Sequence, residues 1–195
     1  MKHLYIIILS FVVFCSSNIT AQRFKATAVI GANASQIDGD SLYGFNKIGL
    51  TVGGRLSYTN EKVWDVALEM LYSQRGSTDG LFRKESNKGI DLHYLEIPVL
   101  FSIRDWYMES DKYYKVRAEG GLSYGHLFQT DATGFNVDDL KKNDVSWIIG
   151  AGINFTKMLG ISLRYTSSFI DLNHKLPEGN TFKSYFLTLR GEVNF

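Results

Sequence analysis

Apolar and polar residues alternate with a period of two along most of the chain. In one stretch, Leu159, Ile161 and Leu163 alternate with Ser162 and Arg164. This period is that of a β-strand, in which successive side chains point to opposite faces. The pattern predicts eight strands, over residues 23–35, 47–59, 63–74, 92–103, 112–126, 144–155, 159–170 and 182–195.

The connections between these strands are alternately short and long. The short ones are 59–62, 104–111 and 156–158, and the long polar ones are 36–46, 75–91, 127–143 and 171–181. Short turns at one end and long loops at the other are typical of outer-membrane barrels, whose termini lie in the periplasm. Each strand is long enough to cross a bilayer at a tilt, which takes ~9–11 residues. We therefore expect an all-β fold, an eight-stranded antiparallel up-and-down transmembrane β-barrel of the outer-membrane type.

The two faces of the strands differ in the size of their side chains. Small residues accompany the charges on one face, at Gly31, Gly49, Gly53, Ser57, Gly121, Ser123, Gly150, Gly152 and Ser162. Aromatic residues lie on the other, at Tyr58, Trp64, Tyr72, Tyr114, Tyr124, Trp147, Phe155, Tyr165, Phe169, Tyr185 and Phe195. The small residues suit a narrow barrel interior, and the rings suit two membrane interfaces. A soluble lipocalin-like barrel or β-sandwich is the alternative, but these rings would overfill its interior.

The small-residue face also carries charges of both signs. They are Arg55, Asp65, Glu69, Glu96, Arg117, Glu119, Arg164, Arg190 and Glu192. A buried charge without a partner costs several kcal/mol, so a closed lumen requires a near-balance of sign. We expect these residues to form a lumen charge network of paired struts. A polar conduit through the barrel is the alternative reading.

The first residues have the layout of a secretory signal peptide. Lys2 precedes the apolar run 4–14, and Ala21 is a suitable residue for cleavage, so we expect a signal peptide over 1–21 and the barrel domain over 22–195. A lipidated Cys15 is the alternative. Removing residues 1–21 takes away Lys2 and the only cysteine, which leaves equal numbers of basic and acidic residues. Such a chain gives no electrostatic reason to expect nucleic acid as a partner.

The last predicted strand ends on an aromatic residue without a charged tail. Tyr185, Leu187, Leu189, Val193 and Phe195 share the outward face. They resemble the C-terminal signal that bacterial outer-membrane proteins present to the barrel assembly machinery. The expected location is therefore the cell outer membrane, and the expected partners are that machinery, outer-membrane lipid and lipopolysaccharide.

The chain also resembles the PorT-like outer-membrane β-barrel proteins common in Bacteroidetes. The resembling stretches are GLTVGGRLSY at 49–58, ALEMLYSQRG at 67–76, HYLEIPVLFSI at 93–103, AEGGLSYG at 118–125 and the terminal LTLRGEVNF. The resemblance implies a small outer-membrane barrel, with a link to protein secretion for PorT itself. It implies no catalytic residues. Pro98 lacks a donor for the sheet, and we expect a local bulge there.

Two enzymatic patterns are alternatives. GDSL at 39–42, with Asp171 and His174, resembles the signature of GDSL esterases and would make Ser41 a nucleophile. Those enzymes use an α/β scaffold, however, and Gly-Asp-Ser is ordinary turn composition. A lipid A acylation or deacylation barrel would pair His126 with Ser123, but these lie on opposite faces of one strand.

We expect a non-enzymatic outer-membrane protein with a structural, surface-binding or secretion-accessory role through its extracellular loops. An unidentified protein partner would bind at those loops. We expect no cofactor and no metal, because the carboxylates of Asp38, Asp40, Asp131, Asp138 and Asp139 lack the spacing of a ligand loop. The alternative is a surface-exposed ester or lipid hydrolase that uses Ser41 and His174, and a pore is a third reading.

Overall fold

The computed structural model describes residues 23–37, 45, 47–59, 63–78, 89–133, 140–171 and 183–195. These residues form eight strands: β1 (Phe24–Ile37), β2 (Lys47–Thr59), β3 (Trp64–Thr78), β4 (Gly89–Met108), β5 (Tyr113–Thr133), β6 (Asn143–Asn154), β7 (Leu159–Ser168) and β8 (Ser184–Asn194). No helix among them is long and apolar enough to cross a membrane.

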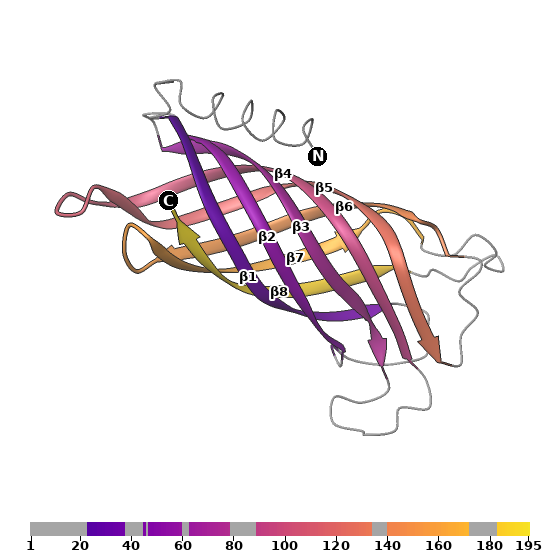
Figure 1. The fold of residues 1–195 in the computed structure, drawn as a ribbon. Coiled ribbons are helices and arrows are strands. Elements are labelled where there is room, and N and C mark those ends of the chain that lie inside the picture. The colour runs from indigo at the N-terminus through magenta and orange to yellow at the C-terminus, as the bar shows by residue number, and fades with distance from the viewer. Residues whose placement is uncertain are drawn as a thin grey trace, which may run out of the picture.

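The strands close into a barrel in sequence order (Figure 1). Each strand pairs antiparallel with its neighbours in the chain. The barrel closes where β8 pairs with β1, from Asn194 opposite Thr27 to Ser184 opposite Ile37. The predicted eight-stranded antiparallel up-and-down barrel is thus confirmed, and it leaves no free edge along the paired length of β1 and β8.

Side chains alternate between the lumen and the outside along each strand. On β7, Leu163 is 52% exposed, whereas its neighbours Ser162 and Arg164 are buried. Every strand places large apolar side chains on the outside, including Ile30, Leu189 and Ile149. Soluble monomers rarely expose a continuous apolar patch above a few hundred Å². An apolar belt around the whole barrel is therefore a surface for hydrocarbon.

The β4–β5 hairpin is longer than the sequence pattern predicts. Its turn lies at 109–112 instead of 104–111, because Arg104–Met108 continues β4 and pairs with the start of β5. Charged and aromatic residues in this stretch resemble a turn in composition, but they form a hairpin that extends past its neighbours. Figure 1 shows this hairpin at the end of the barrel where the C-terminus lies. We call this the short-turn end.

Strands β3, β4 and β5 also extend beyond the barrel wall at the opposite, long-loop end. β5 pairs with β6 only as far as His126, but it pairs with β4 as far as Thr133. β3 pairs with β4 as far as Thr78. The predicted loops 75–91 and 127–143 were therefore too long, and part of each is strand. We call residues 75–78, 89–93 and 127–133 the three-stranded extension.

Pro98 does not form the expected bulge. The one register shift between β4 and β5 lies between His93 and Tyr94, where Phe128 is the extra residue. On the β3 side the register is the same before and after Pro98, but the pairs of Glu69 with Pro98 and of Met70 with Ile97 are missing. A single absent N–H at Pro98 accounts for both missing pairs.

Candidate functional site

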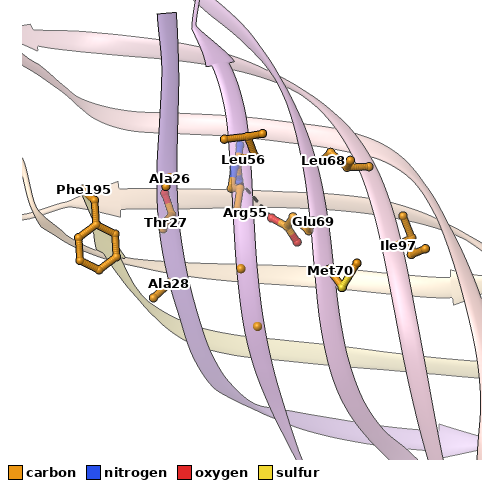
Figure 2. A pocket seen from close by; sticks show the side chains of 12 residues that line it. Ala26, Thr27, Ala28, Arg55, Leu56, Leu68, Glu69, Met70, Ile97 and Phe195 are labelled. Carbon is orange, nitrogen blue, oxygen red and sulfur yellow. Dashed lines mark ion pairs between the residues drawn. The ribbon is translucent and has the colours of Figure 1, made fainter. Parts of the chain in front are cut away.

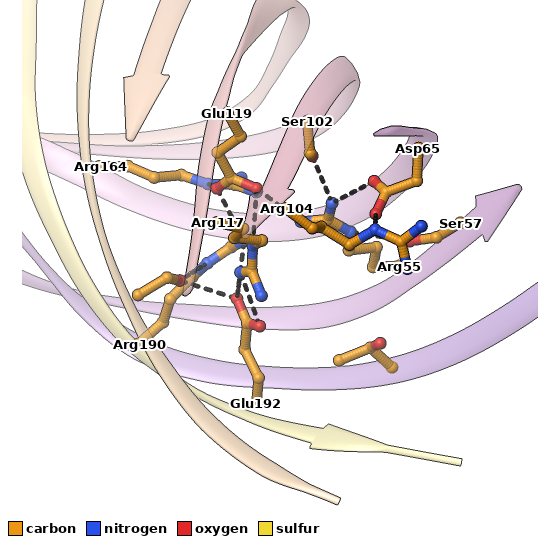
Figure 3. A network of polar contacts seen from close by, with 12 residues as sticks. Arg55, Ser57, Asp65, Ser102, Arg104, Arg117, Glu119, Arg164, Arg190 and Glu192 are labelled. Carbon is orange, nitrogen blue, oxygen red and sulfur yellow. Dashed lines mark hydrogen bonds and ion pairs between the residues drawn. The ribbon is translucent and has the colours of Figure 1, made fainter. Parts of the chain in front are cut away.

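Ion pairs between β2, β3, β5, β7 and β8 lie in the middle of the lumen (Figure 3). We call this set the central charge network: Arg55, Asp65, Glu69, Arg117, Glu119, Arg164, Arg190 and Glu192. All eight side chains are buried. With four arginines and four acids the network is balanced in sign, as charges in a closed lumen must be.

Two arginines of this network each bind a carboxylate through two hydrogen bonds. Arg164 donates from both terminal nitrogens to Glu69, each at 2.7 Å, and from Nε to Glu119 at 2.5 Å. Arg117 donates from Nη2 to both oxygens of Glu192, at 2.6 and 2.7 Å. Charge-assisted forks of this kind are strong and fix the geometry of both partners. The network is therefore a rigid cross-brace between opposite walls.

Serine hydroxyls accept further hydrogen bonds from Arg55 and Arg190. Arg55 donates from Nε to Ser57 at 2.9 Å and from Nη2 to Ser102 at 3.0 Å. Arg190 donates from Nε to Ser162 at 2.8 Å. Satisfied donors matter here because a half-satisfied buried network is worse than an apolar core.

Glycines on the inner face provide the space that these arginines occupy. A Cβ on Gly152 would lie 2.9 Å from Cζ of Arg117. A Cβ on Gly121 would lie 2.1 Å from the backbone oxygen of Val99 on the neighbouring strand. An eight-stranded lumen is only just wide enough for side chains, so these positions require the smallest residue.

A second layer of charge lies nearer the long-loop end. Arg75 donates from Nε to Glu96 at 2.9 Å and from Nη1 to Asp144 at 2.8 Å. Its guanidinium lies between two rings, 4.6 Å from the centre of Tyr94 and 4.3 Å from that of Phe186. Planar arginine suits this sandwich because it stacks on aromatic faces while its edge donates hydrogen bonds. We call this set the upper charge layer.

An apolar cluster closes the lumen above the upper charge layer. It consists of the buried residues Ile37, Ile90, Leu92, Tyr94 and Leu127, with Leu140 packed against them. Between the two charged layers, the cavity near Phe186 and Arg190 has a volume of only about 10 Å³. A water molecule needs at least ~10–15 Å³. The described side chains thus leave little more than the volume of one water molecule between the two charged layers.

All nine residues of the expected lumen network are buried inside the barrel. Eight of them form the central charge network, whereas Glu96 pairs with Arg75 in the upper layer. His126 is exposed and outward, and Ser123 is buried and inward. Ser41 and His174 lie outside the described residues, and Asp171 follows the end of β7. No three metal-binding side chains gather among the residues described.

Other inward-facing charged residues were not among the expected network, including the buried Arg75 and Asp144 and the half-buried Arg104. Arg75 and Arg104 continue the inward periodicity of β3 and β4, but both fell in connections because the predicted strands stopped too early. Asp144 starts the predicted sixth strand on the inward face. If the alternation of inward and outward residues is continued a few residues past each predicted strand end, both arginines fall on the inward face.

Comparison with known families decides what kind of barrel this is. A family described as "Outer membrane protein beta-barrel domain" matches residues 14–173. The chain belongs to this family. The protein is therefore an outer-membrane protein, and its apolar belt faces the lipid. By the rule for this class the short-turn end is periplasmic and the long-loop end is extracellular.

Solved structures of outer-membrane proteins share the fold at low sequence identity. Neisserial surface protein A (NspA) of Neisseria is 11% identical, with a TM-score of 0.56 over 88% of this chain and 97% of that one. Ail, the attachment invasion locus protein of Yersinia pestis, is 17% identical, with a TM-score of 0.51 over 88% and 98%. Ail in complex with the heparin analogue sucrose octasulfate has a TM-score of 0.52 at 16% identity, over 89% and 99%. A search of curated proteins gives no match.

Proposed function

We propose that this outer-membrane protein is a non-enzymatic surface-binding protein whose extracellular loops engage a partner outside the cell. The observation that carries the proposal is the packing of the lumen, where two charged layers and an apolar cluster fill the space that a pore would need. A barrel filled in this way acts as a rigid scaffold. Loops on rigid scaffolds are where binding residues usually occur.

The three-stranded extension supports this role. It raises the ends of β3, β4 and β5 above the rest of the barrel, and the apolar cluster packs on its inner side through Ile90, Leu92 and Leu127. Among the described residues, no strand pairs with the outer edge of β5 over 130–133, beyond the end of its pairing with β6 and the bridge at Leu140. An unpaired strand edge offers backbone donors and acceptors to a partner strand.

The composition of the long connections also favours binding. By the observed strand bounds, each of the four carries a phenylalanine among polar and charged residues: Phe45 before β2, Phe82 before β4, Phe135 before β6 and Phe182 before β8. Aromatic residues are enriched in protein interfaces because they bury much area at a small entropic cost. Phe45 packs edge-on against Tyr185, with ring centres 5.5 Å apart, which ties the first connection to β8.

Export and assembly are part of the same proposal. Residues 1–21 act as a signal peptide, and 22–195 form the exported barrel. Tyr185, Leu187, Leu189, Val193 and Phe195 serve as the signal for the barrel assembly machinery, and their outward placement on β8 supports this. The resemblance to PorT-like proteins of Bacteroidetes supports an accessory role in secretion as one form of the loop-mediated function. Lipopolysaccharide is the lipid partner at the extracellular rim.

The test compares the protein with a variant whose four long connections are replaced by short Gly-Ser turns. Both are reconstituted in nanodiscs and applied to an array of extracellular proteins and glycans. Sulfated saccharides belong in the array because Ail was solved with a heparin analogue. The proposal predicts binding by the protein and none by the variant. Binding that survives loop replacement contradicts it.

Two further assays separate the other functional classes. Planar bilayers containing the protein should show no single-channel steps, and a defined conductance would favour a pore. Short-chain esters and lipid substrates should not be hydrolysed. Hydrolysis that disappears in Ser41→Ala would establish the hydrolase alternative in place of the binding role.

A further inference from the structure

The periplasmic mouth of the barrel contains a cavity of about 350 Å³ that is lined by cationic residues. Five of its lining residues are basic and none is acidic: Arg23, Lys25, Arg104, Lys112 and Lys157. They come from the start of β1, the end of β4 and two of the short turns. We call this space the basic mouth cavity.

The lining of this cavity carries positive charge, and one of its basic side chains, Lys25, differs from the other inward-facing cations. Arg104 lies 3.3 Å from Asp65, but that carboxylate is shared with Arg55. Lys25 is half-buried inside the mouth, and no carboxylate among the described residues lies within 4.0 Å of its ammonium group. Elsewhere in this lumen, the buried cations are paired. Positive charge concentrated in a concave site attracts an anion.

Aromatic residues surround the basic mouth cavity at the level of the membrane surface. Tyr113 and Tyr114 line it, and the ring of Tyr114 lies 4.7 Å from the guanidinium of Arg104. Phe24 packs edge-on against Tyr58, whose hydroxyl accepts a hydrogen bond from Arg23 at 3.2 Å. Rings of this kind mark the interface between hydrocarbon and water. The cavity is therefore within reach of lipid headgroups.

An apolar groove lies on the outer face of the barrel (Figure 2). It has a volume of about 530 Å³ and crosses β1, β2 and β3. The small residues Ala26, Ala28 and Gly54 form the floor of the groove. Larger apolar side chains border it, including Leu56 and Met70. A Cβ on Gly54 would meet nothing closer than 3.9 Å, so the groove is open above this residue. We call it the outer groove.

The basic mouth cavity and the outer groove meet at the end of the chain. Phe195 lines both, and its backbone N–H donates to the oxygen of Ala26 at 2.9 Å. At the start of β1 and just before it, residues 23–25 line the cavity, and residues 26–28 of β1 line the groove. A basic pocket and an apolar groove that adjoin at the membrane surface match the two parts of a lipid, its phosphate and its acyl chain.

We propose that this rim is a binding site for an anionic phospholipid of the periplasmic leaflet. The phosphate occupies the basic mouth cavity, and one acyl chain lies in the outer groove beside Phe195. Basic pockets at membrane surfaces bind anionic headgroups in this manner. The site lies at the opposite end of the barrel from the loops, so it stands independently of the proposed surface-binding role.

Native mass spectrometry of the detergent-solubilised barrel tests the proposal. The protein is titrated with phosphatidylglycerol, with phosphatidylcholine of the same acyl chains, and with glycerol phosphate as the headgroup alone. We expect one phosphatidylglycerol to remain bound at concentrations where the other two do not. Equal retention of the two lipids, or equal binding of glycerol phosphate, overturns the proposal, the latter in favour of a site for free phosphate.

Two variants separate the parts of the site. Lys25→Gln should weaken phosphatidylglycerol binding about fivefold, the effect of one basic residue near an anionic lipid. The thermal stability of Lys25→Gln should be unchanged or higher, because the substitution removes one cation from a group of cations. If Lys25 had only a structural role, the substitution would lower thermal stability instead. Lys142→Gln makes the same change near the extracellular rim and should leave binding unchanged. Phosphatidylglycerol binding that is equal in Lys25→Gln and the unaltered protein overturns the site.

Gly54→Leu places a side chain in the outer groove, at a position where an added Cβ meets nothing closer than 3.9 Å, and should also weaken lipid binding severalfold. Gly120→Leu is its matched control, since Gly120 is an outward glycine on β5 that does not line the groove. We expect Gly120→Leu to bind phosphatidylglycerol as the unaltered protein does. Equal binding by both leucine variants shows that no acyl chain occupies the groove and overturns the proposal.

Discussion

The guanidinium of Arg164 on β7 and the carboxylate of Glu69 on β3 form a two-bond fork across the lumen, with both N–O distances at 2.7 Å. The two strands are not neighbours in the barrel wall. Arg190 also donates to Glu69, at 3.1 Å. One carboxylate thus connects β3 with β7 and β8, and the barrel is braced from inside as well as by its hydrogen-bonded wall.

Removal of this charge should destabilise the barrel strongly. Glu69→Gln keeps the size of the side chain but removes the negative charge that Arg164 and Arg190 share. Breaking a buried pair in this way costs about 3–5 kcal/mol. Urea unfolding followed by tryptophan fluorescence measures the loss. Glu109→Gln, the same change in an exposed short turn, should stay within about 0.5 kcal/mol of the unaltered protein. A loss below about 1 kcal/mol for Glu69→Gln would show that the fork contributes little.

The upper charge layer should require arginine and not merely a positive charge. Arg75→Lys retains the charge but loses the planar stack between Tyr94 and Phe186 and one of the two directed hydrogen bonds. We expect a loss of about 1–3 kcal/mol in the free energy of unfolding. Arg23→Lys on the exposed rim is the control and should change stability little. Equal stability of Arg75→Lys and the unaltered protein would mean that charge alone suffices there.

Adjacent glycines on β5 should respond in opposite ways to alanine. At Gly121 the added methyl group meets the backbone oxygen of Val99, so Gly121→Ala should cost about 1–3 kcal/mol through overpacking. At Gly120 the nearest atom is the oxygen of Ile148 at 3.5 Å, an ordinary contact. Gly120→Ala should be neutral or stabilising by about 0.5–1 kcal/mol. The same urea experiment measures both, and a reversed order would contradict the inward and outward assignment of these residues.

The outward face should show the depth dependence of a membrane-spanning strand. Leu163 lies in the middle of β7, and Leu159 begins the strand at its periplasmic end. Leu163→Arg should cost about 2–4 kcal/mol and Leu159→Arg about 0–1 kcal/mol in lipid vesicles. Unfolding in vesicles measures the difference between the two. Equal costs at the two positions would contradict the placement of the mid-strand residue in hydrocarbon.

The sequence was sufficient to predict the number of strands, their antiparallel order and the face that each residue occupies. These features follow from a period of two that continues over each strand, as on β7 from Leu159 to Ser168. The contacts inside the lumen were not predictable in the same way. Glu69 and Arg164 are 95 residues apart on strands that do not pair. Only the curvature and stagger of the closed barrel bring them together.

Strand ends were the least predictable feature of the fold. Arg75 and Arg104 lie where polar residues follow an apolar strand, which resembles the start of a loop in composition. Both continue the inward face, because β3, β4 and β5 extend past their neighbours at the long-loop end, and β4 and β5 do so at the short-turn end. Pro98 was wrongly expected to form a bulge. The sheet accommodates it by losing one donor to β3 with no change of register.

The central claim is that lipid surrounds the outside of this barrel while packed side chains, not water, fill its lumen. Single-cysteine spin labels along β7, at Ile161, Ser162, Leu163 and Thr166, test both halves of the claim in lipid vesicles. We predict that the labels at Ile161 and Leu163 are accessible to oxygen and inaccessible to a water-soluble nickel chelate. The labels at Ser162 and Thr166 should be inaccessible to both. Access of the nickel chelate to the inward sites would reveal a water-filled lumen, and its access to the outward sites would contradict the membrane barrel itself.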